Sequence, residues 1–167
     1  GITQEDIDLL DPDKLDSKAF WKYITHKFNH GICGAGGGNK TWKESQIEIN
    51  FKLYQSKGVI SFIEFLSSIG YKNVAELGVG FGSLLEWCKI ARLNYIGFDV
   101  AVQKGVEAVE IEDGNIPVEK FGDKQPDIFV CFNVMQHMSK KQRENYLRQI
   151  HSVMPDHAYF IVSMLDS

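Results

Sequence analysis

Apolar residues recur at helical spacing in the first 70 positions of the chain and in short runs after them. Asp11 followed by Pro12 is typical of a helix start, and Thr41 with Glu44 has the spacing of a capping box. Gly70 stands where a helix would end in a left-handed turn. We therefore expect an N-terminal helical extension over residues 1–70, with helices over residues 12–28, 42–56 and 59–68.

A glycine-rich segment separates the first two of these helices. Residues 31–38 include five glycines, whose backbone freedom is costly to fix without a ligand or strong packing. The segment 30–42 is thus either a lid that closes over a ligand or a disordered linker. His26 and His30 share a helical spacing with Cys33 nearby, but so flexible a tract is a poor frame for a metal ion, and we expect no metal site.

After residue 70, short apolar runs alternate with helical ones, which is the pattern of β-α-β units. The connections between the runs are too long for hairpins, which favours parallel pairing. Ser139 and Gln142 form a second capping box and predict a helix over residues 139–153. The sequence therefore predicts a doubly wound α/β core over residues 71–167 with a mainly parallel sheet of about five strands. Strands are expected near residues 73–77, 95–98, 108–111, 127–132 and 158–163.

Charge and composition limit the classes of partner that the chain is expected to bind. The formal net charge of -4 and a pI of about 5.7 give no general attraction for nucleic acid. No apolar stretch approaches the ~20 residues that a membrane span requires. The three cysteines include no C-x-x-C pair, which fits a reducing compartment. We expect a cytoplasmic protein that binds neither nucleic acid nor membrane.

The strongest chemical signal is a glycine turn between the first strand expected for the sheet and the helix after it. Glu76 and Leu77 lead into glycines at positions 78, 80 and 82. Without Cβ atoms such a turn is tight and lets a nucleotide-bearing ligand approach backbone N–H groups at a helix N-terminus. Glycine turns also serve simple packing, so the turn alone leaves binding open. The candidate binding residues here are Glu76, Gly78, Val79, Gly80, Phe81 and Gly82.

Two aspartates follow the next two strands. Asp99 lies 21 positions after Gly78, near the ~20-residue spacing at which a carboxylate accepts hydrogen bonds from ribose hydroxyls. A cap for the helix that follows would also explain Asp99. Asp113 is placed to accept a hydrogen bond from an adenine amino group, although an ordinary Asp–Gly turn with Gly114 accounts for it as well.

The segment 132–138 follows the fourth strand and should project over the reacting end of a cofactor. It begins with Phe132 and Asn133 and contains His137, a candidate general base. A histidine in this place also serves as a polar packing residue, because its imidazole can satisfy local backbone groups. The sequence leaves both interpretations of His137 open.

Residues 74–162 resemble the class I S-adenosylmethionine-dependent methyltransferases, whose fold is Rossmann-like. The run from Ala75 to Gly82 looks like that family's first motif, an acidic residue two positions before a G-x-G-x-G turn. A nicotinamide-binding G-x-G-x-x-G would have its third glycine at position 83, where this chain has Ser83. The resemblance implies S-adenosylmethionine as cofactor and S-adenosylhomocysteine as product. It also implies that Asp99 binds the ribose, that Asp113 and the adjoining Gly114 bind the adenine, and that Phe132 and Asn133 face the methionine end.

Two features depart from the family. Its fold normally adds two strands after the fifth, whereas this sequence ends at Ser167. We expect either a fragment or a sheet edge covered in another way, for example by a homo-oligomer. The connection from Asp99 to Asp113 is also short, so we expect its helix to have only a turn or two.

The activity that the resemblance implies is methyl transfer to an oxygen or nitrogen of a small-molecule acceptor, with His137 as base. One alternative is a non-catalytic module that keeps the fold and serves as a cofactor-binding scaffold in a larger assembly. Another is a nicotinamide-dependent oxidoreductase, against which Ser83 argues. Acceptor specificity in such folds resides in loops without motifs, so the sequence does not identify the acceptor.

Overall fold

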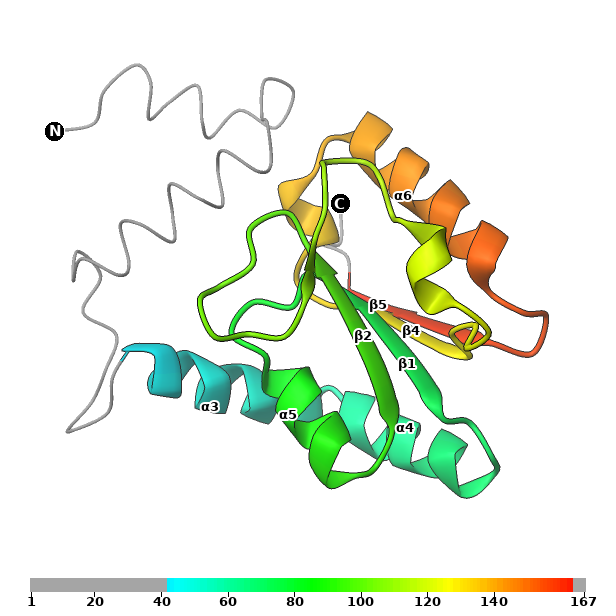
Figure 1. Cartoon of the computed structure of the whole chain (residues 1–167). Coiled ribbons are helices and arrows are strands. Elements are labelled where there is room, and N and C mark those ends of the chain that lie inside the picture. Colours follow the sequence, from blue (N-terminus) through cyan, green and yellow to red (C-terminus); the bar gives the residue numbers. More distant parts are fainter. Residues whose placement is uncertain (1–41, 164–167) are drawn as a thin grey trace, which may run out of the picture.

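Five short strands form a parallel sheet in the order β3-β2-β1-β4-β5. Figure 1 shows β2, β1, β4 and β5 side by side. The computed structural model describes residues 42–163. In this order the chain moves outward from β1 to β3 and then crosses back to β4, so β1 and β4 flank the point where the winding direction reverses. The doubly wound parallel α/β fold predicted from the sequence is confirmed. The strands are β1 (Asn73–Leu77), β2 (Asn94–Asp99), β3 (Val109–Glu110), β4 (Ile128–Cys131) and β5 (Tyr159–Val162).

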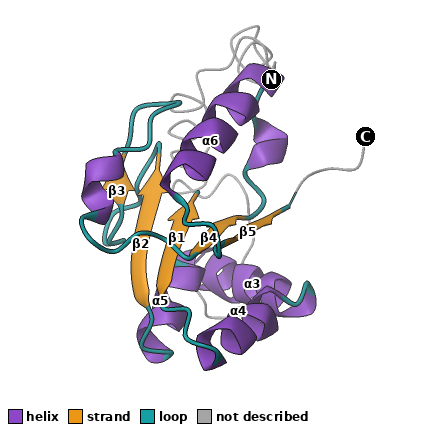
Figure 2. Ribbon diagram, turned by 90° about the vertical axis from the view of Figure 1, so that its right-hand side faces the viewer, coloured by secondary structure: helices purple, strands orange, loops and turns teal. Residues whose placement is uncertain are grey.

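Helices cover both faces of this sheet (Figure 2). One face packs against α3 (Trp42–Ser56), α4 (Val59–Ser68) and α5 (Ser83–Ile90). The other face packs against α6 (Lys140–Val153), whose N-cap Ser139 forms the predicted capping box with Gln142. The bounds of α3 and α4 agree with the prediction. None of the helices between residues 42 and 163 has both the length and the apolar character that a bilayer-spanning helix requires.

The two layers of the core follow from the alternation of side chains along the strands. On β1, Val74 packs with α3, α4 and α5, whereas Ala75 and Leu77 pack on the α6 side. Glu76 therefore points to the same side as Val74, into an apolar layer where a carboxyl group is costly unless it is hydrogen-bonded. This placement determines the surroundings of the first acidic residue of the candidate site.

The connection from β2 to β3 corrects one prediction. We expected a helix of a turn or two there, but the segment 100–108 contains only a turn, in which Val106 N–H donates to the Gln103 carbonyl at 3.1 Å. The residues between β2 and β3 are too few to form a helix and still return to the sheet. The predicted helix over residues 12–28, the glycine-rich segment and its histidines lie outside the described residues.

Candidate functional site

The glycine turn leaves β1 at its carboxyl end and enters α5. Gly78, Gly80 and Gly82 all have positive φ, at 87°, 58° and 89°, where other residues are strained. A Cβ on Gly78 would lie 2.1 Å from Cγ2 of Val134, so no larger residue fits. A Cβ on Gly80 would meet nothing within 4 Å, and Gly80 is exposed. The turn is thus closed by Val134 on one side and open above Gly80 on the other.

Asp99, the last residue of β2, reaches this open part of the turn. Its Oδ2 accepts a hydrogen bond from the Gly80 N–H at 3.1 Å, and its Oδ1 accepts one from the Ala101 N–H at 3.1 Å. The segment between β2 and β3 contains no helix, so the interpretation of Asp99 as a helix cap is wrong. Burial raises the pKa of its carboxyl group, and the backbone donors oppose this rise. Turn and carboxylate therefore converge at the carboxyl end of the sheet.

Glu76 lies beneath the turn and is 0% exposed. Its Oε2 accepts a hydrogen bond from the hydroxyl of Tyr54 at 2.8 Å, and its Oε1 accepts one from the hydroxyl of Tyr95 at 2.5 Å. Burial raises the pKa of Glu76 to about 8, although both hydroxyls lower it. Its carboxyl group is consequently part of the core and faces two tyrosines from α3 and β2.

Asp113 belongs to a turn after β3, in which the Asn115 N–H donates to the Glu112 carbonyl at 3.1 Å and Gly114 has a φ of 80°. The Asp–Gly turn that we considered as an alternative is therefore present. Its carboxylate also accepts hydrogen bonds from Gln142 Nε2 at 2.7 Å and from the Tyr146 hydroxyl at 3.1 Å. The turn is consequently held by side chains of α6.

The segment after β4 contacts both the glycine turn and α3. Asn133 has a φ of 59°, and its N–H donates to Ser163 Oγ at 2.6 Å. The Phe132 ring lies 5.0 Å from the ring of Tyr54. His137 ends a short 3-10 helix, η2 (Met135–His137), and is exposed; partial burial lowers its pKa, which favours the neutral imidazole. Because Val134 also packs against Gly78, this segment borders the candidate site together with the glycine turn and Asp99.

Four residues of this region were not found from the sequence. Tyr54 and Tyr95 carried no motif, because nothing in a sequence pairs two distant tyrosines with one glutamate. Gln142 and Tyr146 did have a signal. With Asn145 and Gln149 they form a polar stripe at helical spacing, which a search for apolar periodicity passes over.

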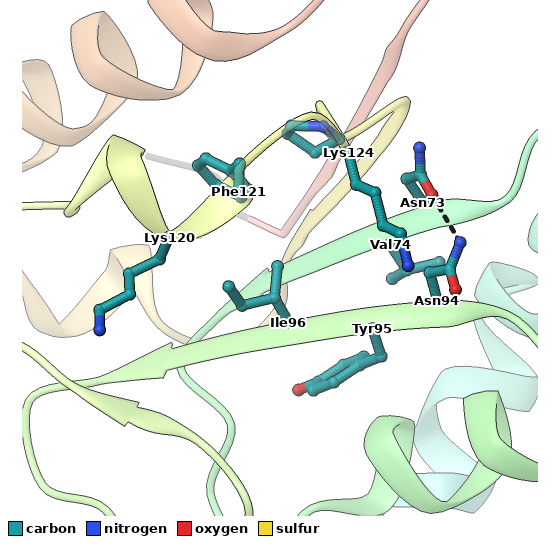
Figure 3. A pocket seen from close by; sticks show the side chains of 9 residues that line it. Asn73, Val74, Asn94, Tyr95, Ile96, Lys120, Phe121 and Lys124 are labelled. Atoms are coloured by element: carbon teal, nitrogen blue, oxygen red, sulfur yellow. Dashed lines mark hydrogen bonds between the residues drawn. The ribbon is translucent and has the colours of Figure 1, made fainter.

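A pocket of about 250 Å³ lies at the other end of the strands (Figure 3). It is lined by the first residues of β1 and β2, where Asn94 Nδ2 donates to Asn73 Oδ1 at 2.8 Å, and by Lys120 and Lys124. The pocket does not include the glycine turn or Asp99. Within residues 42–163, no group of His, Cys, Asp and Glu side chains is arranged to hold a metal ion.

Comparison with known proteins decides the family. A family model described as a methyltransferase domain matches residues 51–167. The chain belongs to this methyltransferase family. The match begins within α3 and includes all five strands, the glycine turn, Asp99 and His137. It confirms the resemblance that the order of the motifs implied.

Solved structures show the same fold at low sequence identity. A SAM-dependent methyltransferase from Archaeoglobus fulgidus matches with a TM-score of 0.56 and 18% identity, over 84% of this chain and 56% of its own. Magnesium protoporphyrin IX methyltransferase from Synechocystis PCC 6803, solved with bound SAM, matches with a TM-score of 0.54 and 14% identity, over 89% of this chain and 81% of its own. This chain thus spans little more than half of the Archaeoglobus protein. No curated protein matches the chain.

Proposed function

We propose that this methyltransferase binds S-adenosylmethionine at the carboxyl end of the sheet and transfers its methyl group to an oxygen or nitrogen of a small molecule. The observation that carries the proposal is the contact between Asp99 and the Gly80 N–H. It joins an acceptor carboxylate to the open part of a glycine turn, at the place where doubly wound folds bind nucleotides. The bound SAM in the Synechocystis structure supports the same choice of cofactor.

The residues at this end of the sheet fit such a cofactor. Asp99 can accept hydrogen bonds from ribose hydroxyls, because its carboxylate lies beside the open part of the turn and each of its oxygens has two acceptor positions. The absence of a Cβ on Gly80 leaves room for a ligand to approach the backbone. The other residues proposed to contact the cofactor lie after the ends of β1, β3 and β4. Val79 and Phe81 flank the open turn, and Glu76 positions the turn from below. Asp113 and Gly114 hold the adenine, and Phe132 and Asn133 face the methionine end.

The cofactor would supply a methyl group on a sulfonium, which is a strong electrophile. Transfer is an in-line displacement, so the protein's part is to align the acceptor and exclude water. His137 would take a proton from an oxygen or nitrogen acceptor, for which a neutral imidazole is needed. The lowered pKa of His137 favours that form. The glycine-rich segment 30–42 remains a proposed lid over this end of the sheet.

The substitution Asp99→Ala tests the cofactor site. It removes the ribose acceptor and leaves two backbone N–H groups without their carboxylate. We expect the affinity for S-adenosylhomocysteine, measured by calorimetry, to fall by about tenfold or more, because hydrogen bonds to charged groups are worth about 1.5–3 kcal/mol.

The matched control is Asp123→Ala, which removes an exposed carboxylate next to Lys124, a residue that lines the pocket at the other end of the strands. Unchanged affinity in Asp99→Ala would contradict the site. Tight binding by the wild type without methyl transfer to any small-molecule acceptor in a broad screen would instead favour the non-catalytic scaffold module.

A further inference from the structure

A polar stripe runs along the side of α6 that packs toward the core. Gln142, Asn145, Tyr146 and Gln149 follow the i, i+3, i+4, i+7 spacing that places residues on one face of a helix. A surface helix normally uses this face for apolar residues. Tyr146 is 0% exposed and the three amides are half-buried. Polar groups in such a place need specific partners.

All four side chains of this stripe find those partners in the turn after β3. Gly114 donates its N–H to the Tyr146 hydroxyl at 2.6 Å, and its carbonyl accepts hydrogen bonds from Asn145 Nδ2 at 2.7 Å and from Gln149. Gln149 also accepts the Ile116 N–H at 2.7 Å. A Cβ on Gly114 would lie 2.8 Å from Asn145 Nδ2. The side chains of the stripe and the backbone of the turn therefore pack closely and satisfy each other's hydrogen bonds.

The same contacts fix the orientation of the Asp113 carboxylate. Gln142 uses its Oε1 to accept the Ser139 N–H in the capping box at 2.9 Å, which turns its Nε2 toward Asp113. The Tyr146 hydroxyl accepts from Gly114, so its own proton is available to Asp113. Burial, together with the charges of Asp113 and Asp99, raises the pKa of Tyr146, so its hydroxyl keeps the proton that it donates to Asp113.

We propose that Gln142 and Tyr146 are positioning residues that set the base specificity of the cofactor site, by holding Asp113 as an acceptor for an exocyclic amino group. The inference rests on the proposed function. A carboxylate held from both oxygens is an acceptor that cannot turn away. It favours a 6-amino purine and repels a 6-oxo purine, which presents an oxygen at the same position.

Two variants test this inference. Gln142→Glu keeps the acceptor that caps Ser139 but replaces the donor to Asp113 with a second carboxyl group. Tyr146→Phe removes the hydroxyl between Gly114 and Asp113. The matched controls are Gln55→Glu on the exposed side of α3 and Tyr159→Phe on β5. Gln142 is half-buried, so its substitution disturbs the core less, and this variant remains informative if Tyr146→Phe does not fold.

The measurement is the ratio of dissociation constants for S-adenosylhomocysteine and its deaminated inosine analogue. Loss of folded protein lowers the affinity for both ligands alike, so the ratio reports on base recognition and not on stability. We expect the wild type to prefer the amino form by about tenfold or more. We expect that preference to fall by about tenfold in Gln142→Glu and Tyr146→Phe and to be kept in both controls.

The outcomes separate this inference from the proposed function. Wild-type protein that binds neither ligand overturns both. Wild-type protein that binds the two ligands equally well overturns the inference alone. Variants that keep the full preference of the wild type show that Gln142 and Tyr146 do not position the acceptor, and they leave S-adenosylmethionine binding unaffected as a proposal.

Discussion

Glu76 and Asp113 are two acids at the same end of the sheet, each held by two side-chain donors. Glu76 receives the hydroxyls of Tyr54 and Tyr95 on the α3 side and is 0% exposed. Asp113 receives Gln142 and Tyr146 on the α6 side and is half-buried at the rim. Glu76 and Asp113 thus have the same number of donors, yet Glu76 is enclosed in the core whereas Asp113 is partly exposed.

The difference lies in what surrounds the donors. Around Glu76, residues of α3, α4, α5, β1 and β4 form a continuous apolar layer, and burial dominates its pKa. Around Asp113, the donors belong to a stripe of amides that also binds backbone groups of the turn. We therefore expect Glu76 to contribute mainly to the stability of the fold and Asp113 mainly to ligand recognition.

The largest expected effect is on stability, from removal of the buried acid. Near pH 5, Glu76→Ala leaves two buried hydroxyls without an acceptor, and we expect a loss of about 3 kcal/mol in the free energy of unfolding. Asp113→Ala should lose less, about 1–2 kcal/mol, because only one of its two donors, the Tyr146 hydroxyl, is fully buried, whereas Gln142 is half-buried. Urea denaturation of both variants measures the difference, and equal losses would refute the comparison.

The pH dependence of stability sharpens the comparison. In the unfolded chain Glu76 has an ordinary pKa near 4.5, whereas in the folded protein its pKa is about 8. Between these pH values the folded protein binds one more proton than the unfolded chain. The stability that Glu76 contributes through this proton is therefore complete at low pH and is lost as the pH rises toward 8.

The slope from this one group is at most about 1.4 kcal/mol per pH unit. Unfolding curves at pH 5, 6.5 and 8 should show this decline in the wild type. Glu76→Gln, which cannot ionise, serves as the reference. A wild type whose stability follows that of Glu76→Gln at all three pH values would show that Glu76 titrates normally.

The smallest expected effect comes from one donor. Tyr54→Phe removes a single hydrogen bond to Glu76, and we expect a loss of about 1 kcal/mol near pH 5. Because that hydroxyl lowers the pKa of Glu76, its removal should move the loss of stability to higher pH. The control is Tyr159→Phe, and an unchanged pH midpoint in Tyr54→Phe would show that its hydroxyl does not act on the carboxyl group.

Much of the fold follows from local patterns. The capping boxes at Thr41 and Ser139 predicted where α3 and α6 begin, because the side chains that satisfy the first N–H groups lie within four residues of each other. The glycine turn could be located because positive φ angles select glycine at Gly78, Gly80 and Gly82. The roles of the site residues, the lid over residues 30–42 and oligomerisation through the sheet edge stay predictions.

The sequence by itself determined the order of strands and helices, the tight turn after Leu77 and the family, because these depend on neighbours along the chain. Only the tertiary structure decided that Glu76 is enclosed by tyrosines 22 positions before it and 19 after it. It also decided that side chains of α6 bind the turn of Asp113, some 30 positions away. Such contacts form between side chains that packing brings together. Their spacing along the chain therefore has no fixed period that a sequence could reveal.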